Sequence, residues 1–517
     1  MHLGKKLFGS LRKDIFQPYL VDYGLPRKRV FRRIVVLCLS LLLSKQIKSE
    51  IRGQRVGVVL PPGLPGFVAN FALFFCDKVP VNLNFTQGPE INREILNSSG
   101  VETVLSASAM KIKFPHFPWP ENCFWLDEFL NEITSNRWLI LRTCLLALLF
   151  PRLTVRQFHV PAKGGYKEAI LLYTSGSSGK PKGVPLSHRN LLENCRQLHD
   201  LELFRAQPRV LANLPLFHSF GMTVGMIFPT LYGLPVVATP SPLDYRLNSR
   251  AISEQRVEIL LGTPTFLRGY LKMAEHGELD SIRYIVAGAE KSPVSFRKRW
   301  EKKINCQYLE GYGLTETAPA LSFNLPGEGK RCGSVGRLLQ GVECRTIDPE
   351  SGAETDREQG GILCFRGANI FSGYFGDEDK TTEVLDEDGW FKTGDLGRLD
   401  SDGFLWIEGR VSRFSKIGGE MVPHGRVEEE IIGVLGFCSS DEPILVVSAM
   451  QDEKKGEKLV VVCTQPVDQA RVRNGLMKKG IPNLWIPRHF IEVDKIPLLP
   501  SGKTDWEKIR QLASKPD

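Results

Sequence analysis

The sequence lacks several patterns that mark other classes of protein. Its 517 residues include 11 cysteines, but none of them forms a C-x-x-C pair or a Cys/His cluster at zinc-ligand spacing. This usage argues against a disulfide framework or a metal site and is typical of a reducing compartment, so we expect a cytoplasmic protein. Internal repeats and low-complexity tracts are absent as well. A chain of this length is then expected to fold into two or three globular domains.

Long apolar runs are also scarce. Two stretches stand out, 34–43 and 138–150, and both are shorter than the roughly 20 residues that a spanning helix requires. The first follows a basic region that is too long for a signal peptide, and no small-residue cleavage site comes after it. We therefore predict that neither run crosses a bilayer and that both form buried helices. The alternative is that they help a peripheral protein settle at the inner face of a membrane.

Acidic residues are few at the start of the chain. Residues 1–33 contain nine basic residues and only two acidic ones, Asp14 and Asp22, whereas the net charge of the whole chain is +9. This segment is either a solvated basic face or a contact surface for anionic lipid or an acidic partner. No nucleic-acid-binding motif accompanies the charge, so we do not expect nucleic acid as a partner. The basic residues are Lys5, Lys6, Arg12, Lys13, Arg27, Lys28, Arg29, Arg32 and Arg33.

From about Val56 onward, apolar β-branched runs alternate with helical patterns. This alternation predicts an α/β fold of parallel sheets covered by helices. Shorter strands with Gly and Asp turns after about Gly360 predict a β-rich subdomain, and the last hundred or so residues are typical of a small α+β domain. We predict a basic and apolar lead-in over 1–50, a large domain over 51–410 and a small, mobile C-terminal domain over 411–517. The strand candidates are 169–175, 235–239, 258–264 and 283–289.

A glycine-serine turn is the strongest local signal. YTSGSSGKPKG, residues 173–183, directly follows the apolar strand candidate at 169–175. Glycines and small hydroxylic residues let backbone N–H groups and hydroxyls close around phosphate oxygens, and Lys180 and Lys182 add positive charge. It is not a Walker loop, because Pro181 follows Lys180. A flexible linker is the alternative, but a linker would not abut a buried strand. The candidate phosphate-binding residues are Thr174, Ser175, Gly176, Ser177, Ser178, Gly179 and Lys180.

With a second motif, GYGLTET at residues 311–317, this turn gives the chain a resemblance to the adenylate-forming superfamily of acyl-CoA synthetases, nonribosomal-peptide adenylation domains and luciferases. The resemblance spans about residues 50 to 510 and implies ATP and Mg²⁺ as cofactors. It implies that Tyr312 lies against adenine, Thr315 meets the α-phosphate and Glu316 holds magnesium. These roles suit an aromatic face and a hard cation. Alone, the motif could be a glycine-bearing turn with a surface glutamate, but its pairing with the phosphate-binding turn argues against that alternative.

Further segments complete the nucleotide site by the same resemblance. AGAE at residues 287–290 corresponds to the segment beside adenine, and Asp395 of a TGD turn would accept both ribose hydroxyls, a role that suits two carboxylate oxygens. An arginine fifteen residues later, Arg410, falls where the family has one near the ribose and the interdomain hinge. The residues implied for nucleotide binding are Gly288, Ala289, Glu290, Tyr312, Gly313, Thr315, Asp395 and Arg410.

The loop PLLPSGKTD, residues 497–505, resembles the family's C-terminal loop with its catalytic lysine, here Lys503. A flexible ammonium can bridge the fatty carboxylate and the α-phosphate as negative charge develops. The implied mechanism forms acyl-AMP and pyrophosphate, after which a thiol displaces AMP while the small domain rotates. The pivot is expected at 410–413, although Ser412 stands where the family usually has Asp or Lys. The alternative for Lys503 is an exposed lysine in a Pro/Gly loop.

The segment PLFHSFG, residues 215–221, resembles the border of the family's acyl pocket and implies that His218 lies near the substrate carboxylate. A buried structural histidine is the alternative. Bulky, flexible neighbours at Met222, Met226 and Phe228 suit an alkyl tunnel. No aspartate for a substrate ammonium is evident, so the expected substrate is a long-chain fatty acid. The predicted catalytic set is Lys503, Thr315, Glu316 and His218.

Three stretches, 79–88, 145–154 and 411–422, look closer to the acyl-acyl carrier protein synthetases than to generic acyl-CoA ligases. The expected acceptor is therefore the phosphopantetheine thiol of acyl carrier protein, and coenzyme A is the alternative because both acceptors are anionic. Members of that group are often fused to a lysophospholipid acyltransferase with an H-x-x-x-x-D pair. We expect a stand-alone synthetase here.

Two other classes remain open. A non-catalytic relative that binds lipid or protein at a membrane surface is one, although intact Lys503, Glu316 and Asp395 argue against it. A luciferase-like oxygenase is the other, because a fold does not determine a function.

Overall fold

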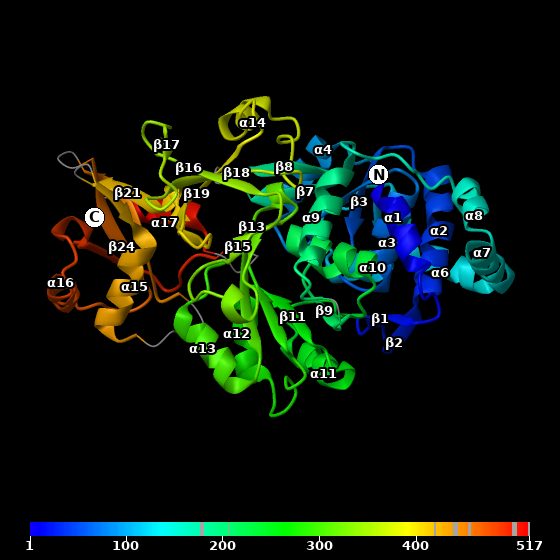
Figure 1. The fold of residues 1–517 in the computed structure, drawn as a ribbon, viewed down its shortest axis with the longest axis horizontal. Helices are drawn as coiled ribbons and strands as arrows, with labels where there is room; N and C mark the ends of the chain where they lie inside the picture. The colour runs from blue at the N-terminus through cyan, green and yellow to red at the C-terminus, as the bar shows by residue number, and fades with distance from the viewer. Residues whose placement is uncertain are drawn as a thin grey trace. The chain divides into compact units, whose positions relative to one another are not determined.

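The computed structural model describes residues 1–175, 180–204, 206–417, 420–437, 443–452, 456–498 and 504–514. These residues belong to two compact units, each described by itself. The first unit comprises Met1–Gly176, Lys180–Glu343 and Phe365–Phe391, and the second comprises Ser177–Gly179, Cys344–Cys364 and Lys392–Asp517. Figure 1 colours the chain from the blue N-terminus to the red C-terminus. The α/β fold predicted from the sequence is confirmed, with sheets and helices alternating along the chain (Figure 1).

The first unit contains a nine-stranded sheet in the order β15-β14-β13-β12-β11-β9-β10-β1-β2. Its central strands are parallel, and the antiparallel pairings lie at the two edges. Three of the four strand candidates, 235–239, 258–264 and 283–289, coincide with β10, β11 and β12, so those predictions are confirmed. The strands are β1 (Pro18–Asp22), β2 (Arg29–Arg32), β9 (Val210–Ala212), β10 (Val236–Ala238), β11 (Ile259–Gly262), β12 (Tyr284–Ala287), β13 (Gln307–Gly313), β14 (Ala320–Phe323) and β15 (Arg337–Leu338).

A six-stranded sheet in the order β6-β5-β3-β4-β7-β8 completes the strands of this unit. All its pairings are parallel except the last, where β8 turns back antiparallel to β7. The fourth strand candidate, 169–175, is β7. The strands are β3 (Arg55–Val59), β4 (Val79–Asn82), β5 (Val104–Ser106), β6 (Cys123–Trp125), β7 (Glu168–Ser175) and β8 (Pro181–Ser187).

Helices cover these sheets, because each presents an apolar face that must be buried. A cluster led by Trp300, Tyr270 and Tyr308 fills the core between the nine-stranded sheet and its helices. The helices are α1 (Leu3–Leu11), α2 (Arg33–Glu50), α3 (Leu64–Phe75), α4 (Pro89–Ser99), α5 (Ser108–Lys113), α6 (Leu126–Ser135), α7 (Arg137–Leu149), α8 (Pro151–Gln157), α9 (His188–Asp200), the π-helix η1 (Phe220–Ile227), α10 (Phe228–Tyr232), α11 (Tyr245–Gln255), α12 (Pro264–Met273), α13 (Val294–Lys303), η2 (Thr315–Thr317), η3 (Gly327–Gly329) and α14 (Glu378–Val384).

The first fifty residues are part of this unit's architecture. Strands β1 and β2 extend the nine-stranded sheet, and α2 packs on α3. Arg33 is buried and donates hydrogen bonds to the carbonyls of Lys13 and Gly233. At least one cation of the basic segment therefore stabilises the fold instead of facing a partner.

The two apolar runs have different environments. The first forms most of α2 and is buried, as predicted. The second forms α7, and the prediction that it is buried is wrong, because Trp138 is 79% exposed and Leu149 is 59% exposed. The apolar composition of α7 does not identify which of its sides the fold covers.

Among the described residues, no helix combines the length and the apolar character needed to cross a membrane.

The second unit contains two five-stranded sheets. One has the order β17-β16-β18-β19-β20, and the other has the order β22-β21-β24-β23 with β25 paired to β24. A buried cluster that includes Val461, Ile431 and Leu476 packs α15 and α16 on the latter sheet. The elements are β16 (Glu343–Ile347), β17 (Glu354–Thr355), β18 (Gly361–Arg366), β19 (Phe391–Leu399), β20 (Leu405–Arg410), η4 (Val411–Arg413), β21 (Phe414–Ile417), β22 (Glu420–Pro423), α15 (His424–Leu435), β23 (Leu445–Asp452), β24 (Gly456–Cys463), α16 (Gln469–Lys478), η5 (Asn483–Trp485), β25 (His489–Glu492) and α17 (Trp506–Ala513).

The domain limits stay a prediction. In the structure the β-rich segments Cys344–Cys364 and 392–410 cluster with the C-terminal residues instead of with the large domain. The predicted α+β character of the C-terminal section agrees with helix α15 and strand β24.

Candidate active site

The predicted phosphate turn joins two antiparallel strands. β7 and β8 pair with Thr174 opposite Lys182 and Ser175 opposite Pro181. β7 is parallel to β4 and buried at Ile170 to Leu172, so the strand that precedes the predicted turn is part of a buried sheet. Gly176, Ser177, Ser178 and Gly179 lie outside the described residues. Thr174 is half-buried and Lys180 is exposed beside the turn.

Contacts among three side chains connect this hairpin to the GYGLTET motif. The Tyr374 hydroxyl donates a hydrogen bond of 2.9 Å to Glu316 Oε1, and Lys182 Nζ lies 5.2 Å from the centroid of the Tyr374 ring. Glu316 is only 7% exposed. Burial lowers the pKa of Lys182, and nearby Lys380 lowers it further, whereas Glu316 opposes the shift. The structure therefore brings a carboxylate and a lysine together around one aromatic ring.

Tyr374 was not among the residues singled out from the sequence. It lies in the segment FSGYFG, far along the chain from Glu316. Its backbone N–H donates to Thr381 Oγ1 at 2.9 Å, and its ring meets Phe371 with centroids 5.0 Å apart. The only feature of the sequence that could have drawn attention to Tyr374 is its position in a glycine-containing segment. That feature does not indicate which carboxylate its hydroxyl contacts.

Buried asparagines of α9 and a neighbouring loop fix the backbone around Glu316. Asn194 donates to the Ala320 carbonyl at 2.7 Å and accepts the Ala320 N–H at 3.1 Å. Asn369 donates to the Thr317 carbonyl at 2.9 Å, and the Phe371 N–H donates to the Glu316 carbonyl at 2.8 Å. Buried polar groups left without partners are costly, so these contacts specify one backbone path.

The AGAE and GYGLTET segments follow adjacent parallel strands. Ala287 at the end of β12 pairs with Glu310 of β13, and a Cβ placed on Gly288 would lie 3.4 Å from the Gly311 carbonyl oxygen. Ala289 has a positive φ of 67°. The two segments therefore meet at the same sheet edge, where α/β sheets bind ligands.

The side chain of Glu290 has a partner within the fold. Its Oε2 accepts hydrogen bonds from the Thr265 N–H at 3.1 Å and the Thr265 hydroxyl at 2.7 Å, at the start of α12. This contact holds the loop after β12 against the loop after β11. Glu290 thus connects two loops of the predicted nucleotide site.

Gly313 allows a close backbone approach that no other residue would permit. A Cβ at this position would lie 1.8 Å from the carbonyl oxygen of Pro319. The glycine lets β13 fold back against β14, and Thr315 then begins the short helix η2 that carries Glu316. The neighbouring Tyr312 is half-buried, with its ring centroid 6.0 Å from that of Phe365.

His218 lies in the loop before the π-helix η1 and is exposed. The alternative of a buried structural histidine is therefore wrong. Its ring meets Phe217 with centroids 4.8 Å apart, and Phe217 meets Phe85 at 5.4 Å. The predicted alkyl-tunnel residues Met222, Met226 and Phe228 are buried. The role of His218 beside the substrate carboxylate stays a prediction.

The remaining nucleotide residues, Asp395 and Arg410, belong to the second unit and contact each other. They are cross-strand partners on β19 and β20, and Arg410 Nε donates to Asp395 Oδ1 at 2.8 Å. Asp395 is 3% exposed, whereas the Arg410 side chain is largely exposed. The resemblance implied separate roles for these two residues, whereas in the structure they form one ion pair.

The predicted pivot at 410–413 lies between two anchored arginines. Arg413 donates from Nη2 to both carboxylate oxygens of Glu428 on α15, at 2.9 and 2.8 Å, and lies 3.4 Å from the Trp506 ring centroid on α17. Burial raises the pKa of Glu428, and the charge of Arg413 opposes that shift. Only two residues, Val411 and Ser412, separate this anchor from Arg410.

Lys503 lies outside the described residues. The residues that flank its loop are held together: Leu498 and Thr504 form an isolated antiparallel bridge, and the Asp505 N–H donates to the Pro497 carbonyl at 2.9 Å. The role of Lys503 stays a prediction.

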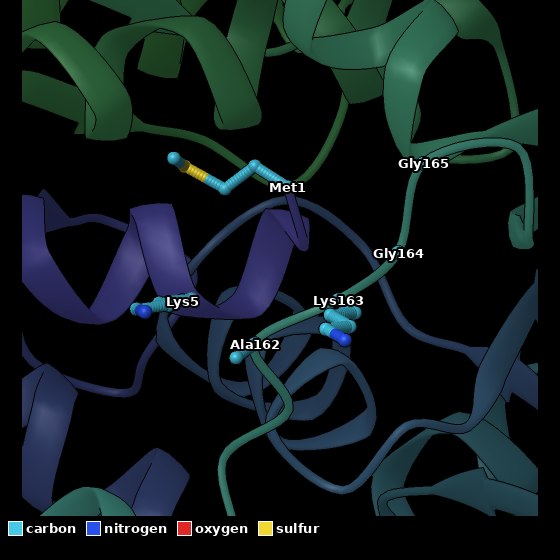
Figure 2. Close-up of a pocket in the computed structure, with 6 residues that line it drawn as sticks. All are labelled: Met1, Lys5, Ala162, Lys163, Gly164 and Gly165. Atoms are coloured by element: carbon cyan, nitrogen blue, oxygen red, sulfur yellow. The ribbon is translucent and has the colours of Figure 1, made fainter.

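A pocket at the start of α1 is separate from these residues. Figure 2 shows Lys5 and Lys163 beside Met1 and the turn at Gly164 and Gly165. None of the residues that line it was predicted to bind nucleotide.

Nearby, His2, Asp77 and His188 place possible metal-ligand atoms within 4.8 Å of one another. Both Nδ1 atoms already have protein partners, because the Gly4 N–H donates to His2 Nδ1 at 3.0 Å and the Leu3 N–H donates to His188 Nδ1 at 3.3 Å. This cluster anchors the start of α1.

An H-x-x-x-x-D spacing does occur in the sequence, at His489 and Asp494. His489 begins β25 and pairs with Val460 of β24, whereas Asp494 follows the strand. The expectation of a stand-alone synthetase stays a prediction.

Comparison with known proteins places the chain in a family. It matches the AMP-binding enzyme family over residues 42–375 and belongs to that family. A mitochondrial medium-chain acyl-CoA ligase of Macaca fascicularis is 29% identical over 66% of this chain, and the chain spans only 56% of that relative's length. The sulfoacetate–CoA ligase of Cupriavidus necator is 28% identical over 88% of this chain and 87% of its own.

Solved structures agree with the fold. ATP-bound MatB from Rhodopseudomonas palustris has a TM-score of 0.80 at 23% identity and covers 99% of each chain. The O-succinylbenzoate coenzyme A synthetase of Bacillus subtilis, in complex with ATP and magnesium, has a TM-score of 0.79 at 22% identity, covering 98% of this chain and 99% of its own.

We predict that Gly313→Ala destabilises the first unit. The new methyl group would overlap the Pro319 carbonyl, so the β13–β14 turn must shift at a cost of about 2 kcal/mol. Thermal unfolding monitored by circular dichroism should show a lower midpoint. Gly9→Ala in α1 is the matched control, since a Cβ there meets nothing within 4 Å. Equal midpoints for both variants would contradict the close approach.

Proposed function

We propose that this chain is an acid–thiol ligase that activates a long-chain fatty acid with ATP and passes the acyl group to the phosphopantetheine thiol of acyl carrier protein. The observation that carries the activation step is the buried Glu316 carboxylate, which Tyr374 orients beside Lys182 and the β7–β8 hairpin. ATP and Mg²⁺ are the cofactors. The proposed location is the cytoplasm.

The residues around Glu316 fit a magnesium ion. A carboxylate offers two oxygens, and Oε1 receives one hydrogen bond from Tyr374, which leaves acceptor capacity for a hard cation beside phosphate oxygens. Glu316 would hold the ion, and the bound ion would neutralise charge on the phosphates. The chemistry of the donor set therefore agrees with the cofactor.

In the proposed first step, a carboxylate oxygen of the fatty acid attacks the α-phosphorus of ATP, and pyrophosphate leaves. Backbone N–H groups and hydroxyls of the β7–β8 turn hold the phosphates, while Tyr312 contacts adenine. Thr315 meets the α-phosphate, and Lys503 bridges it to the carboxylate, stabilising the developing charge. His218 lies at the carboxylate end of the acyl region.

In the proposed second step, the thiol sulfur attacks the acyl carbonyl carbon of acyl-AMP, AMP leaves and the thiol proton is lost. Asp395 accepts the ribose hydroxyls in this proposal, and its ion pair with Arg410 fixes the carboxylate. Rotation of the small domain about Val411 and Ser412, which lie between Arg410 and Arg413, would switch the site from acyl-AMP formation to thioester formation.

The choice of acyl carrier protein rests on the resemblance of segments 79–88, 145–154 and 411–422 to acyl-acyl carrier protein synthetases. A fatty acyl-CoA ligase is the second candidate, because relatives such as the Macaca fascicularis and Cupriavidus necator proteins are named as CoA ligases.

A thiol-acceptor assay tests the proposal. The chain is incubated with ATP, Mg²⁺ and fatty acids of increasing length, with either holo-acyl carrier protein or coenzyme A, and thioester formation is measured. We expect product with the holo-carrier and long chains, and none with the apo-carrier, which lacks the thiol. Turnover confined to coenzyme A would overturn the acceptor, and no fatty-acid-dependent ATP–pyrophosphate exchange would favour the non-catalytic alternative.

Tyr374→Phe is expected to weaken activation by about tenfold, the effect of losing one hydrogen bond to a charged group. The readouts are ATP–pyrophosphate exchange and the Mg²⁺ concentration for half-maximal rate, which should rise because the Glu316 carboxylate is no longer oriented. Tyr166→Phe, at an exposed tyrosine, is the matched control. A lower rate with an unchanged Mg²⁺ requirement would assign Tyr374 a purely structural role.

Lys503→Ala should abolish acyl-AMP formation while thiol capture from supplied acyl-AMP stays largely intact. The reason is that the ammonium stabilises charge only in the first step. Lys495→Ala, at an exposed lysine of the same unit, should leave both half-reactions unchanged. Equal loss of both half-reactions in Lys503→Ala would contradict the domain-rotation mechanism.

A further inference from the structure

Exposed apolar side chains are concentrated on α7 and α8. Of the eighteen large hydrophobic residues that are exposed among those the structure describes, seven lie within 138–153. Scattered exposed hydrophobic residues are normal, but a contiguous set marks a contact surface. The seven are Trp138, Leu141, Leu145, Leu148, Leu149, Phe150 and Leu153. We call this set the α7–α8 surface.

The α7–α8 surface is the outer side of a helix that packs on its other side. Leu141, Leu145 and Leu149 recur every four residues and therefore share one helical face. Thr143 and Ala147 are buried, and Cys144 Sγ lies 3.0 Å from Cys38 Sγ of α2. Figure 1 draws α7 and α8 at the outer edge of the first unit. A helix that is apolar on all sides is normally buried, so the open side of α7 requires a partner.

The segment that carries this surface has charge of one sign. Residues 137–167 contain no Asp or Glu, and four arginines alternate with the exposed apolar residues. All four are exposed, and none forms an ion pair with another of the described residues. An arginine can lay its alkyl stem on apolar surface while its guanidinium reaches water or phosphate. The four are Arg137, Arg142, Arg152 and Arg156.

We propose that the α7–α8 surface docks this protein on an anionic lipid bilayer. An apolar helical face with Trp138 near one end and arginines along its sides has the composition of an interfacial helix. α7 is about 20 Å long at 1.5 Å per residue, so it would lie in the plane of the headgroups. The inference rests on α7 and α8 alone and holds whether or not the proposed reaction is correct.

Charge favours lipid over the other occupants. In a two-fold symmetric dimer the same surface of each copy contacts its counterpart. A dimer formed through the α7–α8 surface would therefore bring the arginines of both copies together. An acidic protein would neutralise the arginines but would also need an apolar groove for the leucines. In an anionic bilayer, the headgroups can pair with the arginines and the acyl chains can bury the apolar side chains.

Co-sedimentation of the full chain with vesicles tests the proposal. We expect binding to vesicles of phosphatidylcholine with phosphatidylglycerol, little binding to phosphatidylcholine alone, and release by high salt. The double variant Leu145→Ser/Leu149→Ser should partition about tenfold more weakly, since two apolar side chains leave the lipid. Each of Arg152→Gln and Arg156→Gln should weaken partitioning by about fivefold.

Leu243→Ser/Val294→Ser is the matched control, because both residues are exposed outside the surface. This control should bind vesicles like the wild type. All variants should keep the wild-type unfolding midpoint and the wild-type rate of fatty-acid-dependent ATP–pyrophosphate exchange measured without vesicles, which separates a failure of docking from a failure of the proposed function.

Three results would overturn the proposal. The first is vesicle binding that the α7 and α8 variants do not change. The second is a concentration-dependent dimer, seen by analytical ultracentrifugation, that the leucine variant abolishes. The third is loss of carrier-protein capture in that variant with vesicle binding retained, which would assign the surface to a protein partner.

Discussion

The candidate site depends on a small set of buried amide hydrogen bonds. Asn190 and Asn194 lie one turn apart on α9 and hold two different loops, the first through the Ile370 carbonyl at 2.7 Å and the second through Ala320. Asn369 completes the set by donating to the Thr317 carbonyl. Each amide would be costly to bury without these partners, so the loops have little freedom to take another path. Glu316 and Tyr374 lie on those two loops, and their contact follows from the shared support.

The second unit uses charge in a different way. Arg410 pairs across two strands with a buried aspartate, and Arg413 pairs with Glu428 on a helix. The Arg413–Glu428 pair is mostly buried, so removing either partner would leave an uncompensated charge. The Arg410 side chain is 61% exposed, so its pair with Asp395 restrains it less. The backbone between them is short and carries no such restraint. The pivot at 410–413, where Ser412 differs from the usual family residue, stays a prediction.

Strand positions and the turn motifs could be predicted because they depend on local pattern. The apolar run at 169–175 is β7, and GYGLTET begins in the last residues of β13, at the sheet edge where ligand loops are expected. The contact of Tyr374 with Glu316 could not be predicted, because it depends on how two distant loops are supported. The pairing of Asp395 with Arg410 depends in the same way on strand register. The Glu290 contact with Thr265 is a further case in which a residue expected beside nucleotide also has a structural partner.

The misassignment of α7 as a buried helix has a physical cause. Composition reports how apolar a helix is, whereas burial depends on how many of its sides the fold covers, and α7 is covered on the side of Thr143 and Ala147 only. An exposed leucine is solvated in the folded and the unfolded chain alike, so it contributes little to the free energy of unfolding. Folding stability therefore does not explain the leucines on the open face. Their concentration beside arginines that form no ion pair with the described residues is explained if that face loses water only when a lipid surface covers it.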